Sequence, residues 1–331
     1  MGLFDKIKEP VFLKDTSDAD EQIKMLEEIG KTAPDDVKKL IDYDIRLLRA
    51  GIKGEENILF ELKNSGMPMI IIRDLFIVSG ELSAQIDFLI VTRKLNYIIE
   101  CKNLFGNIEI NSKGDFIRTV NYGGNFKKEG IYSPVTQNMR HLEVIRQIRR
   151  NTKTNLISKA IFDKYFEENY RSVVVLSNPK TVVNMKYAKK EIKDKVIRYD
   201  QLVDYIKNTN RKSKEETISE RQMEELAEFF LKINQKKQVD YAEKYKRILE
   251  ARLNLESDTY EKEIKHDEKE DNSIIKGTTP EDKIICPKCG ALMVRRRAQK
   301  GPNAGNEFYG CSCYPKCKCI INIKPEKKDI F

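Results

Sequence analysis

The chain has 331 residues, of which 40% are hydrophobic and 34% are charged, and its 61 basic and 52 acidic residues give a net charge of +9. This length favours one full core with a smaller appended module, and the basic excess favours a polyanionic partner such as nucleic acid. No run approaches the roughly 18–20 apolar residues of a membrane span, and Met1–Lys8 is charged where a secretion signal is apolar. The sequence therefore predicts a cytoplasmic protein with no membrane partner.

Helical periodicity dominates the start of the chain. Apolar residues spaced for one helix face predict two helices within 18–50, separated by Gly30 and Pro34. A third helix is expected from Gly51 until Asn64 and Gly66 stop it. We assign residues 1–50 to a helical N-terminal extension.

Short β-rich runs follow, and they predict a meandering, partly antiparallel sheet. They occupy residues 69–73, 75–78, 84–91, 97–102, 107–110 and 115–120. An amphipathic helix is expected over 135–150, a buried strand over 172–176 and a short strand over 195–198, with one more helix behind it. This mixture predicts an α/β domain over 51–210.

The rest of the chain divides by composition. Two further helices are expected within 211–255, where they would pack on the core or contact a protein partner. Apolar residues nearly vanish over 256–282, which is typical of a flexible, charged linker. Six of the seven cysteines then crowd into the C-terminal part, which we assign as a small metal-binding module over 283–323.

Charged residues interrupt two of the apolar runs in the predicted sheet. Asp87 lies within a run that otherwise reads as a buried strand, and Glu100 and Lys102 alternate near the end of the next run. Side chains two apart on a strand point to one face. A hairpin turn at residues 94–95 would pair Asp87 with Lys102 and would bring all three charged groups to that face.

Two carboxylates and an ammonium buried together would lose their hydration, and a hard divalent cation relieves that cost. If Asp87 and Glu100 hold Mg²⁺ (or Mn²⁺), sites remain on the metal for a phosphate oxygen and a nucleophilic water. Lys102 would orient that water or neutralise charge that grows on the phosphate. The alternative is a structural salt bridge at the end of a sheet.

The ordered motifs resemble a known family. They are Gly51-Ile52-Lys53-Gly54-Glu55, then Gln85-Ile86-Asp87, then Ile99-Glu100-Cys101-Lys102-Asn103 with Gly106, and finally Gln137 with His141 on a helix. Over about residues 50–200 this set resembles the nuclease-related domain, NERD, of the PD-(D/E)xK nuclease superfamily. The resemblance implies a restriction-endonuclease-like mixed sheet flanked by helices. It also implies that Asp87 and Glu100 bind the metal and that Lys102 is the catalytic lysine.

The same resemblance adds two residues to the expected site. Glu55 would be a further acidic member, and Gln137 would face the same cavity and hydrogen-bond the scissile phosphate or a metal-bound water. His141 lies one helical turn after Gln137, and we expect it to be structural. We expect Cys101, which points to the opposite face from its neighbours, to belong to the core.

The C-terminal cysteines form two halves of a metal site. Cys286 and Cys289 flank a tight turn that ends at Gly290, and the second half follows over Cys311–Cys319. Paired halves of this kind predict a structural Zn²⁺.

The segment from Cys286 to Cys317 resembles the C-terminal zinc finger of bacterial type I topoisomerases, a small zinc-ribbon-like module. That resemblance implies the ligands Cys286, Cys289, Cys311 and Cys317. Cys313 and Cys319 are additional, and each is an alternative ligand.

Cations and flat rings in this module are the groups that bind phosphates and bases of nucleic acid. They are Arg295, Arg296, Arg297, Lys300, Phe308 and Tyr309. The alternative is a solvated basic face over a core in which the rings only pack. Taken together, the sequence predicts a metal-dependent nuclease for nucleic acid, with DNA favoured, whose zinc finger assists binding. A catalytically inactive, DNA-binding adaptor and an RNA-directed nuclease are the alternatives.

Overall fold

The computed structural model describes residues 7–236, 241, 243–253, 284, 286–288, 290–298 and 305–322. The chain forms two compact units. The first comprises Met1–Ala19 with Leu47–Gln238, and the second comprises Asp20–Arg46 with Val239–Phe331. The predicted linker over 256–282 lies outside the described residues. None of the described helices is long and apolar enough to span a membrane.

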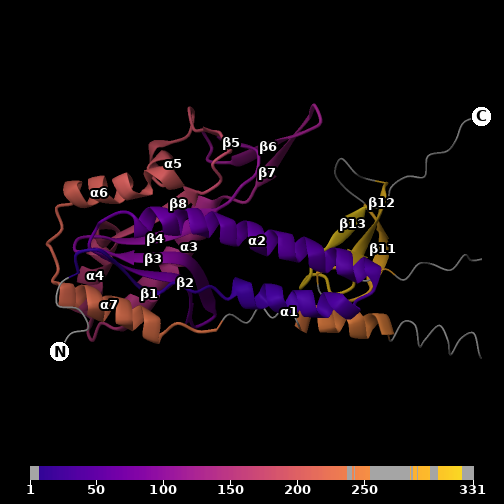
Figure 1. Cartoon of the computed structure of the whole chain (residues 1–331), viewed down its shortest axis with the longest axis horizontal. Helices are drawn as coiled ribbons and strands as arrows, with labels where there is room; N and C mark the ends of the chain where they lie inside the picture. Colours follow the sequence, from indigo (N-terminus) through magenta and orange to yellow (C-terminus); the bar gives the residue numbers. More distant parts are fainter. Residues whose placement is uncertain are drawn as a thin grey trace, which may run out of the picture. The chain divides into compact units, whose positions relative to one another are not determined.

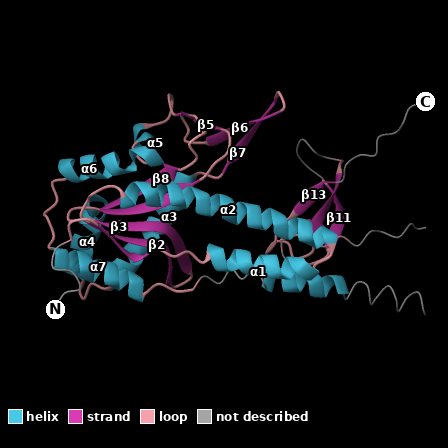
Figure 2. Ribbon diagram, viewed as in Figure 1, coloured by secondary structure: helices cyan, strands magenta, loops and turns pink. Residues whose placement is uncertain are grey.

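A six-stranded mixed sheet forms the centre of the first unit (Figure 2). Its strands, in spatial order, are β1 (Pro10–Lys14), β2 (Met69–Ser79), β3 (Leu82–Val91), β4 (Asn96–Lys102), β8 (Tyr170–Leu176) and β10 (Val196–Arg198). β2, β3 and β4 form an antiparallel meander, whereas β1, β8 and β10 each join a neighbour in parallel. This mixed sheet confirms the predicted α/β class.

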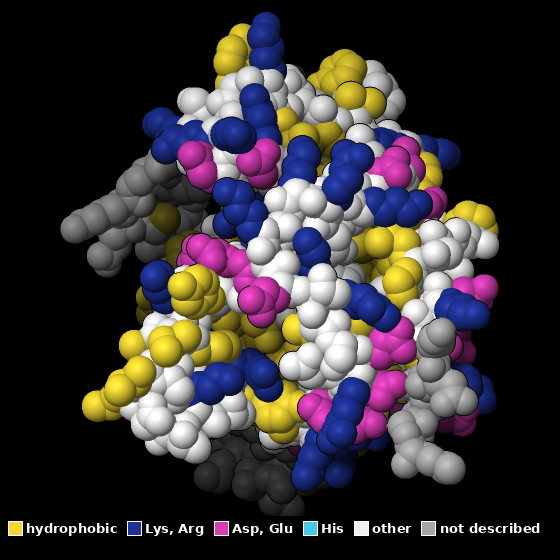
Figure 3. Space-filling view, turned by 90° about the vertical axis from the view of Figure 1, so that its left-hand side faces the viewer, with side chains coloured by type: hydrophobic (Ala, Val, Ile, Leu, Met, Phe, Trp, Pro, Cys, Tyr) yellow, Lys and Arg dark blue, Asp and Glu magenta, His cyan; other side chains and the backbone are white. Residues whose placement is uncertain are grey.

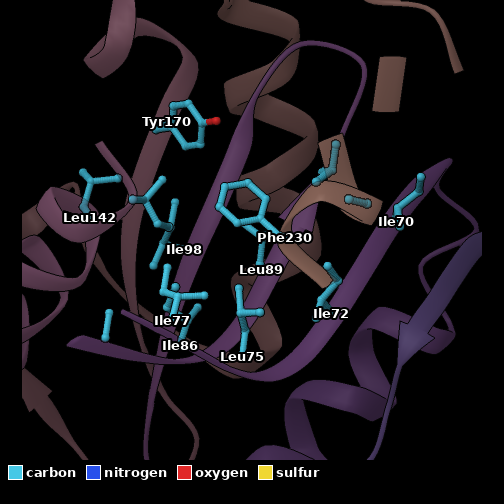
Figure 4. Packing of buried hydrophobic residues seen from close by; sticks show 14 of the residues in the cluster. Ile70, Ile72, Leu75, Ile77, Ile86, Leu89, Ile98, Leu142, Tyr170 and Phe230 are labelled. Carbon is cyan, nitrogen blue, oxygen red and sulfur yellow. The ribbon is translucent and has the colours of Figure 1, made fainter. Parts of the chain in front are cut away.

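Helices cover both faces of this sheet. Buried contacts place α3 (Pro134–Asn151), α4 (Leu156–Asn169) and α7 (Glu220–Lys232) on one face of the sheet. The other face is covered by α2 (Asp35–Lys63) and α6 (Leu202–Lys212). Figure 4 shows the first core, where Leu142 of α3 and Phe230 of α7 meet sheet residues such as Leu89 and Ile98. Their side chains exclude water, and that burial is the main term that stabilises the unit.

A second, four-stranded sheet follows β4 along the chain. Its order is β7 (Asn125–Ile131), β6 (Phe116–Tyr122), β5 (Asn107–Ile110) and β9 (Val183–Asn184). Ile108, Ile110 and Phe116 pack against Val174 and Leu176 of the main sheet. The β6–β7 hairpin projects from this contact (Figure 1). Two short helical turns, α5 (Lys190–Lys193) and the 3₁₀ turn Tyr199–Gln201, flank β10.

The structure corrects the predicted start of the domain. α2 is one continuous helix through Gly51, where separate helices were expected. β2 is likewise one strand rather than two, and β1 and α4 have no counterpart in the prediction. A glycine inside a helix costs about 1 kcal/mol relative to alanine, and packing of α2 against the sheet offsets that cost.

The second unit contains α1 (Ala19–Thr32), the first part of α2, a helix over 243–253 and a three-stranded antiparallel sheet. The strands are β11 (Met293–Arg297), β12 (Glu307–Cys311) and β13 (Ile320–Asn322). Tyr245 donates a hydrogen bond of 2.8 Å from its hydroxyl to Asp44 and is fully buried. Small and rich in cysteine, the sheet agrees with the predicted C-terminal module.

Candidate functional site

The acidic residues lie where β3 and β4 separate. Pairing between these strands runs from Val91 opposite Asn96 to Phe88 opposite Ile99. Asp87 is the next residue on β3, and Glu100 is the next on β4. The two carboxylates therefore stand at the mouth of a fork in the sheet.

The predicted hairpin register is wrong by two residues. Leu89 pairs with Ile98, so Asp87 continues opposite Glu100 rather than Lys102. A slip of two positions returns every side chain to the face it had before. The expectation that Glu100 and Lys102 share a face is therefore unaffected.

Thr92 explains the difference in register. Its backbone N–H donates to the carbonyl of Leu95 at 3.1 Å, and its hydroxyl accepts from the N–H of Leu95 at 3.1 Å. These bonds close a turn one residue earlier than the predicted turn at 94–95. Counting residues along the two strands cannot predict a turn in which a side-chain hydroxyl replaces a backbone hydrogen-bond partner.

β4 sends alternate side chains into two different environments. Tyr97 and Ile99 belong to the core under α2, and Cys101 packs against that core. Ile98 belongs to the core under α3, so Glu100, two residues along, points to the α3 side. The motif thus separates its cysteine from its charged residues, as expected.

On the α3 side, Glu100 holds Lys102. Lys102 Nζ lies 2.5 Å from Glu100 Oε1, and Glu100 is only 2% exposed while the Lys102 side chain is 26% exposed. The ion pair joins a buried carboxylate to an amine that solvent or a ligand can reach. Such a pair loses much of its hydration, so its geometry must be supported by the fold.

Asp87 lies between the two strands. Its Oδ2 accepts a hydrogen bond of 2.6 Å from the backbone N–H of Cys101. Burial first, and then the negative charges of Glu100 and Glu55, raise the pKa of Asp87 well above its ordinary value. Asp87 therefore lies close enough to both of the other carboxylates to be repelled by them.

Both strands of the β2–β3 pair change face beside Asp87. Ile72 and Leu75 on β2 lie in the same core, as do Ile86 and Leu89 on β3, so strict alternation fails once on each strand. At that point of β2, Asp74 adopts a left-handed φ of +52°, a conformation that non-glycine residues rarely adopt. This shift turns Asp87 away from the α3 core, so the expectation that all three charged groups share one face does not hold for Asp87, whose carboxylate lies between the two strands.

Gln85, the first residue of the second motif, supports that shift. Its Nε2 donates to Asp74 Oδ1. Asp74 Oδ2 also accepts from the backbone N–H of Asp18 at 2.9 Å. Asp74 is thus fixed by partners from two other segments.

Glu55 reaches the site from α2, and Arg73 binds it. Arg73 Nε and Nη2 each lie 2.8 Å from Glu55 Oε2, and Arg73 Nη1 donates to the carbonyl of Asp15 at 2.9 Å. Sequence reasoning missed Arg73. The signal was a lone basic residue inside the apolar run 69–78, which needs a carboxylate partner when it is buried.

Gly54 lets α2 approach the ends of β4 and β8. A Cβ atom at this position would meet Ser177 Oγ at 2.5 Å and Asn103 Cβ at 2.8 Å. Two amides hold the same contact, since Asn103 Nδ2 donates to the Ala50 carbonyl at 2.6 Å and Asn57 Nδ2 donates to the Ser177 carbonyl at 2.9 Å. The first motif therefore sets the position of Glu55.

α3 brings Gln137 and His141 to the Glu100 side. His141 Nδ1 lies 3.3 Å from Glu100 Oε2. Gln137 is half-buried, four residues earlier on the same helix, and so lies on the same side as His141.

Asn138, which sequence reasoning missed, anchors α3. It is fully buried, and its Nδ2 donates to the carbonyls of Ile98 at 2.8 Å and Val173 at 3.1 Å. Its position in the apolar stripe with Leu142 and Ile145 was the available signal, because a buried amide needs partners.

The acidic groups fit a divalent cation. Glu100 Oε2 and His141 Nδ1 are buried and make no hydrogen bond among the residues that the structure describes. A carboxylate oxygen that faces a histidine nitrogen without a hydrogen bond, beside the second carboxylate of Asp87, is a suitable oxygen ligand for Mg²⁺. The geometry permits the predicted pair of ligands, Asp87 and Glu100, which stays a prediction.

Three cysteines gather in the second unit. The sulfur atoms of Cys286, Cys311 and Cys317 all lie within 4.8 Å of one another. Within the described ranges, no other group of three cysteine, histidine or acidic residues meets that limit. The cluster supports Zn²⁺, since thiolates at this spacing suit a tetrahedral site. Cys289, the fourth expected ligand, lies outside the described residues.

The two additional cysteines differ in their surroundings. Cys313 is exposed. Cys319 is buried, and its burial and its contact with Cys286 raise the pKa of its thiol to about 11. Cys319 therefore borders the cluster more closely than Cys313 does.

The expected nucleic-acid residues divide between two faces of the small sheet. Arg296 pairs with Phe308 across the strands, and a Cβ at Gly310 would touch both of their side chains. Arg295 pairs with Tyr309, which packs in the cysteine core. Arg297 is two residues from Arg295 on β11, so its side chain lies on the same face. Lys300 lies outside the described residues.

Two family models match the chain. The nuclease-related domain, NERD, matches residues 50–177. The topoisomerase DNA binding C4 zinc finger matches residues 283–326. These matches confirm both resemblances predicted from the sequence. No curated protein and no solved structure matches the chain.

Proposed function

Because the chain carries a nuclease-related domain at 50–177 and a topoisomerase-type C4 zinc finger at 283–326, we propose that it is a metal-dependent nuclease that hydrolyses phosphodiester bonds in DNA. The observation that carries the proposal is the meeting of Asp87, Glu100 and Lys102 at the fork between β3 and β4. We further propose a cytoplasmic location, where reduced thiols can bind zinc.

Asp87 and Glu100 are the proposed ligands of Mg²⁺ or Mn²⁺. A bound divalent cation would polarise a phosphate oxygen and lower the pKa of a metal-bound water. The mutual repulsion that raises the pKa of Asp87 supports this assignment, because a cation offsets it. Binding the metal would also free Lys102 from its ion pair with Glu100.

Lys102 is the proposed catalytic lysine. Its partly exposed ammonium would donate hydrogen bonds to the oxygens of the scissile phosphate as negative charge accumulates on them. The water oxygen forms the new bond to phosphorus and gives up one proton to solvent, the ester P–O bond breaks, and the leaving oxygen takes up a proton from solvent. Lys102 stabilises the charge of this step and does not act as its base.

Glu55 and Gln137 are proposed to complete the site. Glu55 adds negative charge that acts on Asp87, and Arg73 holds its carboxylate in place. Gln137 would hydrogen-bond the phosphate or its attacking water from α3.

The zinc finger is proposed to raise the local concentration of DNA at the domain. Arg296 and Phe308 are the best-placed pair for this contact, since a cation and a ring on one face suit a phosphate and a base. A protein partner of residues 211–255 would use exposed faces only, because α7 buries Met223, Ala227 and Phe230 in the core.

A catalytically inactive adaptor is the second candidate. The ion pairs Glu100–Lys102 and Glu55–Arg73 favour it, since they already satisfy part of the acidic charge without a metal. RNA is the second candidate substrate, because hydrolysis at this site requires only a phosphodiester.

The test is a cleavage assay with linear DNA, circular DNA and RNA, with and without Mg²⁺, using the full chain loaded with zinc. We expect Mg²⁺-dependent cleavage of DNA, and a loss of at least about 100-fold in Lys102→Ala. Lys113→Ala, which removes an exposed lysine, is the matched control. DNA retention without cleavage would support the adaptor, and cleavage of RNA alone would support the RNA-directed enzyme.

A further inference from the structure

A separate cavity of about 620 Å³ opens beside the start of β8, between α3, α5 and α6. β10 pairs with β8 only over Val174–Leu176, so the edge of β8 at Arg171 and Ser172 is left uncovered by β10. Ser172 lies opposite Ile98, whereas Lys102 lies opposite Leu176. The cavity and the acidic site are therefore at different ends of the same strands.

Basic side chains exceed acidic ones in the wall of this cavity. The basic ones are Arg171, Lys190, Lys195 and Lys212, and the acidic ones are Glu167 and Asp194. Within the described part of the chain, none of the four cations forms an ion pair with a carboxylate. Arg171 Nη1 instead donates to the backbone carbonyls of Glu167 and Tyr170. The cavity therefore carries excess positive charge.

One cation in the wall has a weak partner. Lys195 is half-buried, and its Nζ lies 3.2 Å from Met139 Sδ, although a thioether is a poor acceptor for an ammonium. The nearby Ser172 Oγ makes no hydrogen bond among the described residues, but it has almost no accessible surface and is out of reach of a ligand. An anion in the cavity would therefore give Lys195 a better acceptor.

The size and the other walls restrict the ligand. Small-molecule sites measure roughly 300–1,000 Å³, and this cavity is far larger than a phosphate ion needs. Tyr170, Tyr205, Met139 and Leu142 add rings and apolar surface. Figure 3 views the molecule from the side of α4, α6 and α7 and shows Lys and Arg side chains scattered among acidic and hydrophobic ones on that face. Charge and shape together favour an anion with an attached flat group.

We propose that this cavity binds a mononucleotide, with its phosphate held by Lys195 and Arg171 and its base against the apolar wall. The proposal is independent of the nuclease activity, since neither Glu100 nor Lys102 lines the cavity. Charge-assisted hydrogen bonds to phosphate are stronger than neutral ones, so the phosphate should supply most of the affinity.

Titration calorimetry of the full chain with adenosine 5′-monophosphate, adenosine and inorganic phosphate tests the proposal. We expect the monophosphate to bind, adenosine to bind at least about tenfold more weakly, and phosphate to compete at higher concentration. Equal binding of adenosine would overturn the proposal. So would binding of phosphate without binding of the nucleotide, or no binding at all.

Variants locate the ligand. Lys195→Met keeps the length and apolar stem of the side chain and should weaken binding by about tenfold. Lys189→Ala removes a neighbouring exposed charge that does not line the cavity, and it should leave affinity unchanged.

Two further outcomes complete the test. An equal loss of nucleotide affinity in Lys189→Ala and Lys195→Met would indicate diffuse electrostatic attraction and would overturn the proposed site. Lys102→Ala should bind the nucleotide as wild type does, whereas loss of binding there would move the ligand to the acidic site. A urea unfolding midpoint of Lys195→Met close to that of the wild type would confirm that this variant folds.

Discussion

The acidic site and the cysteine cluster assemble their groups in opposite ways. Asp87, Glu100 and Lys102 stand on strands of a six-stranded sheet whose apolar residues, such as Ile98 and Ile99, are fully buried. That scaffold is stabilised by its own core. Among the described residues, the cysteine cluster has few buried core residues beyond the cysteines themselves.

The core of the small module shows this dependence directly. Its buried members are Cys286, Met293, Cys311 and Cys319. Three of the four are cysteines, so a metal at the cluster would be part of what holds the strands together. A metal at the acidic site would therefore serve catalysis, whereas a metal at the cysteine cluster would serve folding.

Removal of zinc should have the largest effect. Structural zinc contributes roughly 10–16 kcal/mol of apparent binding free energy in small modules, so chelation should unfold β11–β13 and leave the main sheet intact. Hydrogen exchange measures this: Cys311 amide protection should disappear, while Ile98 and Ile99 stay protected.

Cysteine variants sharpen the same prediction. Cys317→Ser should mimic chelation, and Cys313→Ser, at an exposed position, should not. Retained protection of β12 without zinc would contradict the dependence of this module on metal.

Asn138→Ala should have the next largest effect. It removes both hydrogen bonds to the sheet carbonyls, and loss of buried partners of this kind costs about 2 kcal/mol. Urea unfolding measures the change. Gln137→Ala, the adjacent half-buried position, should alter stability by less than about 0.5 kcal/mol and should reduce cleavage. Equal destabilisation by the two changes would show that α3 is not anchored by Asn138.

Gly54→Ala tests the approach of α2 to the sheet. The added Cβ would overlap Ser177 and Asn103, and overpacking of this kind costs about 1–3 kcal/mol. Gly51→Ala in the same helix meets no atom within 4 Å, and it should stabilise the protein by up to about 1 kcal/mol. The comparison fails if both substitutions change the unfolding free energy in the same direction.

Arg296→Ala should have the smallest effect. Loss of a single phosphate contact lowers affinity for DNA by a few-fold and reduces the salt dependence of binding by about one unit. Arg295 Nη2 already lies 2.5 Å from Glu307, so Arg295→Ala should change DNA affinity less. Fluorescence anisotropy at several salt concentrations would separate them, and a larger loss in Arg295→Ala would assign binding to the other face.

Local patterns predicted the parts of the fold that local residues determine. The apolar runs gave β3 and β4 close to their observed bounds, and alternation along β4 separated Cys101 from Glu100. The cysteine spacing likewise predicted the cluster, because its members are close in sequence.

Contacts between distant residues could not be predicted in this way. β1 is a five-residue strand that forms only by pairing with β2, far along the chain. α4 exposes Leu156, Ile157 and Ile161, so its apolar residues do not mark one buried face. The ion pair between Arg73 and Glu55 also depends on tertiary approach, and no spacing rule contains it.

The most direct test of the central claim uses Glu100, Cys101 and Lys102, which are neighbours on β4. The claim is that the carboxylate of Glu100 and the amine of Lys102 act together on one face of this strand. Single-turnover cleavage of labelled DNA in Mg²⁺ should fall by at least about 100-fold in both Glu100→Gln and Lys102→Ala. Cys101→Ala, whose side chain points to the opposite core, should cleave within about twofold of wild type. Wild-type rates in Lys102→Ala, or an equal loss in Cys101→Ala, would contradict the account.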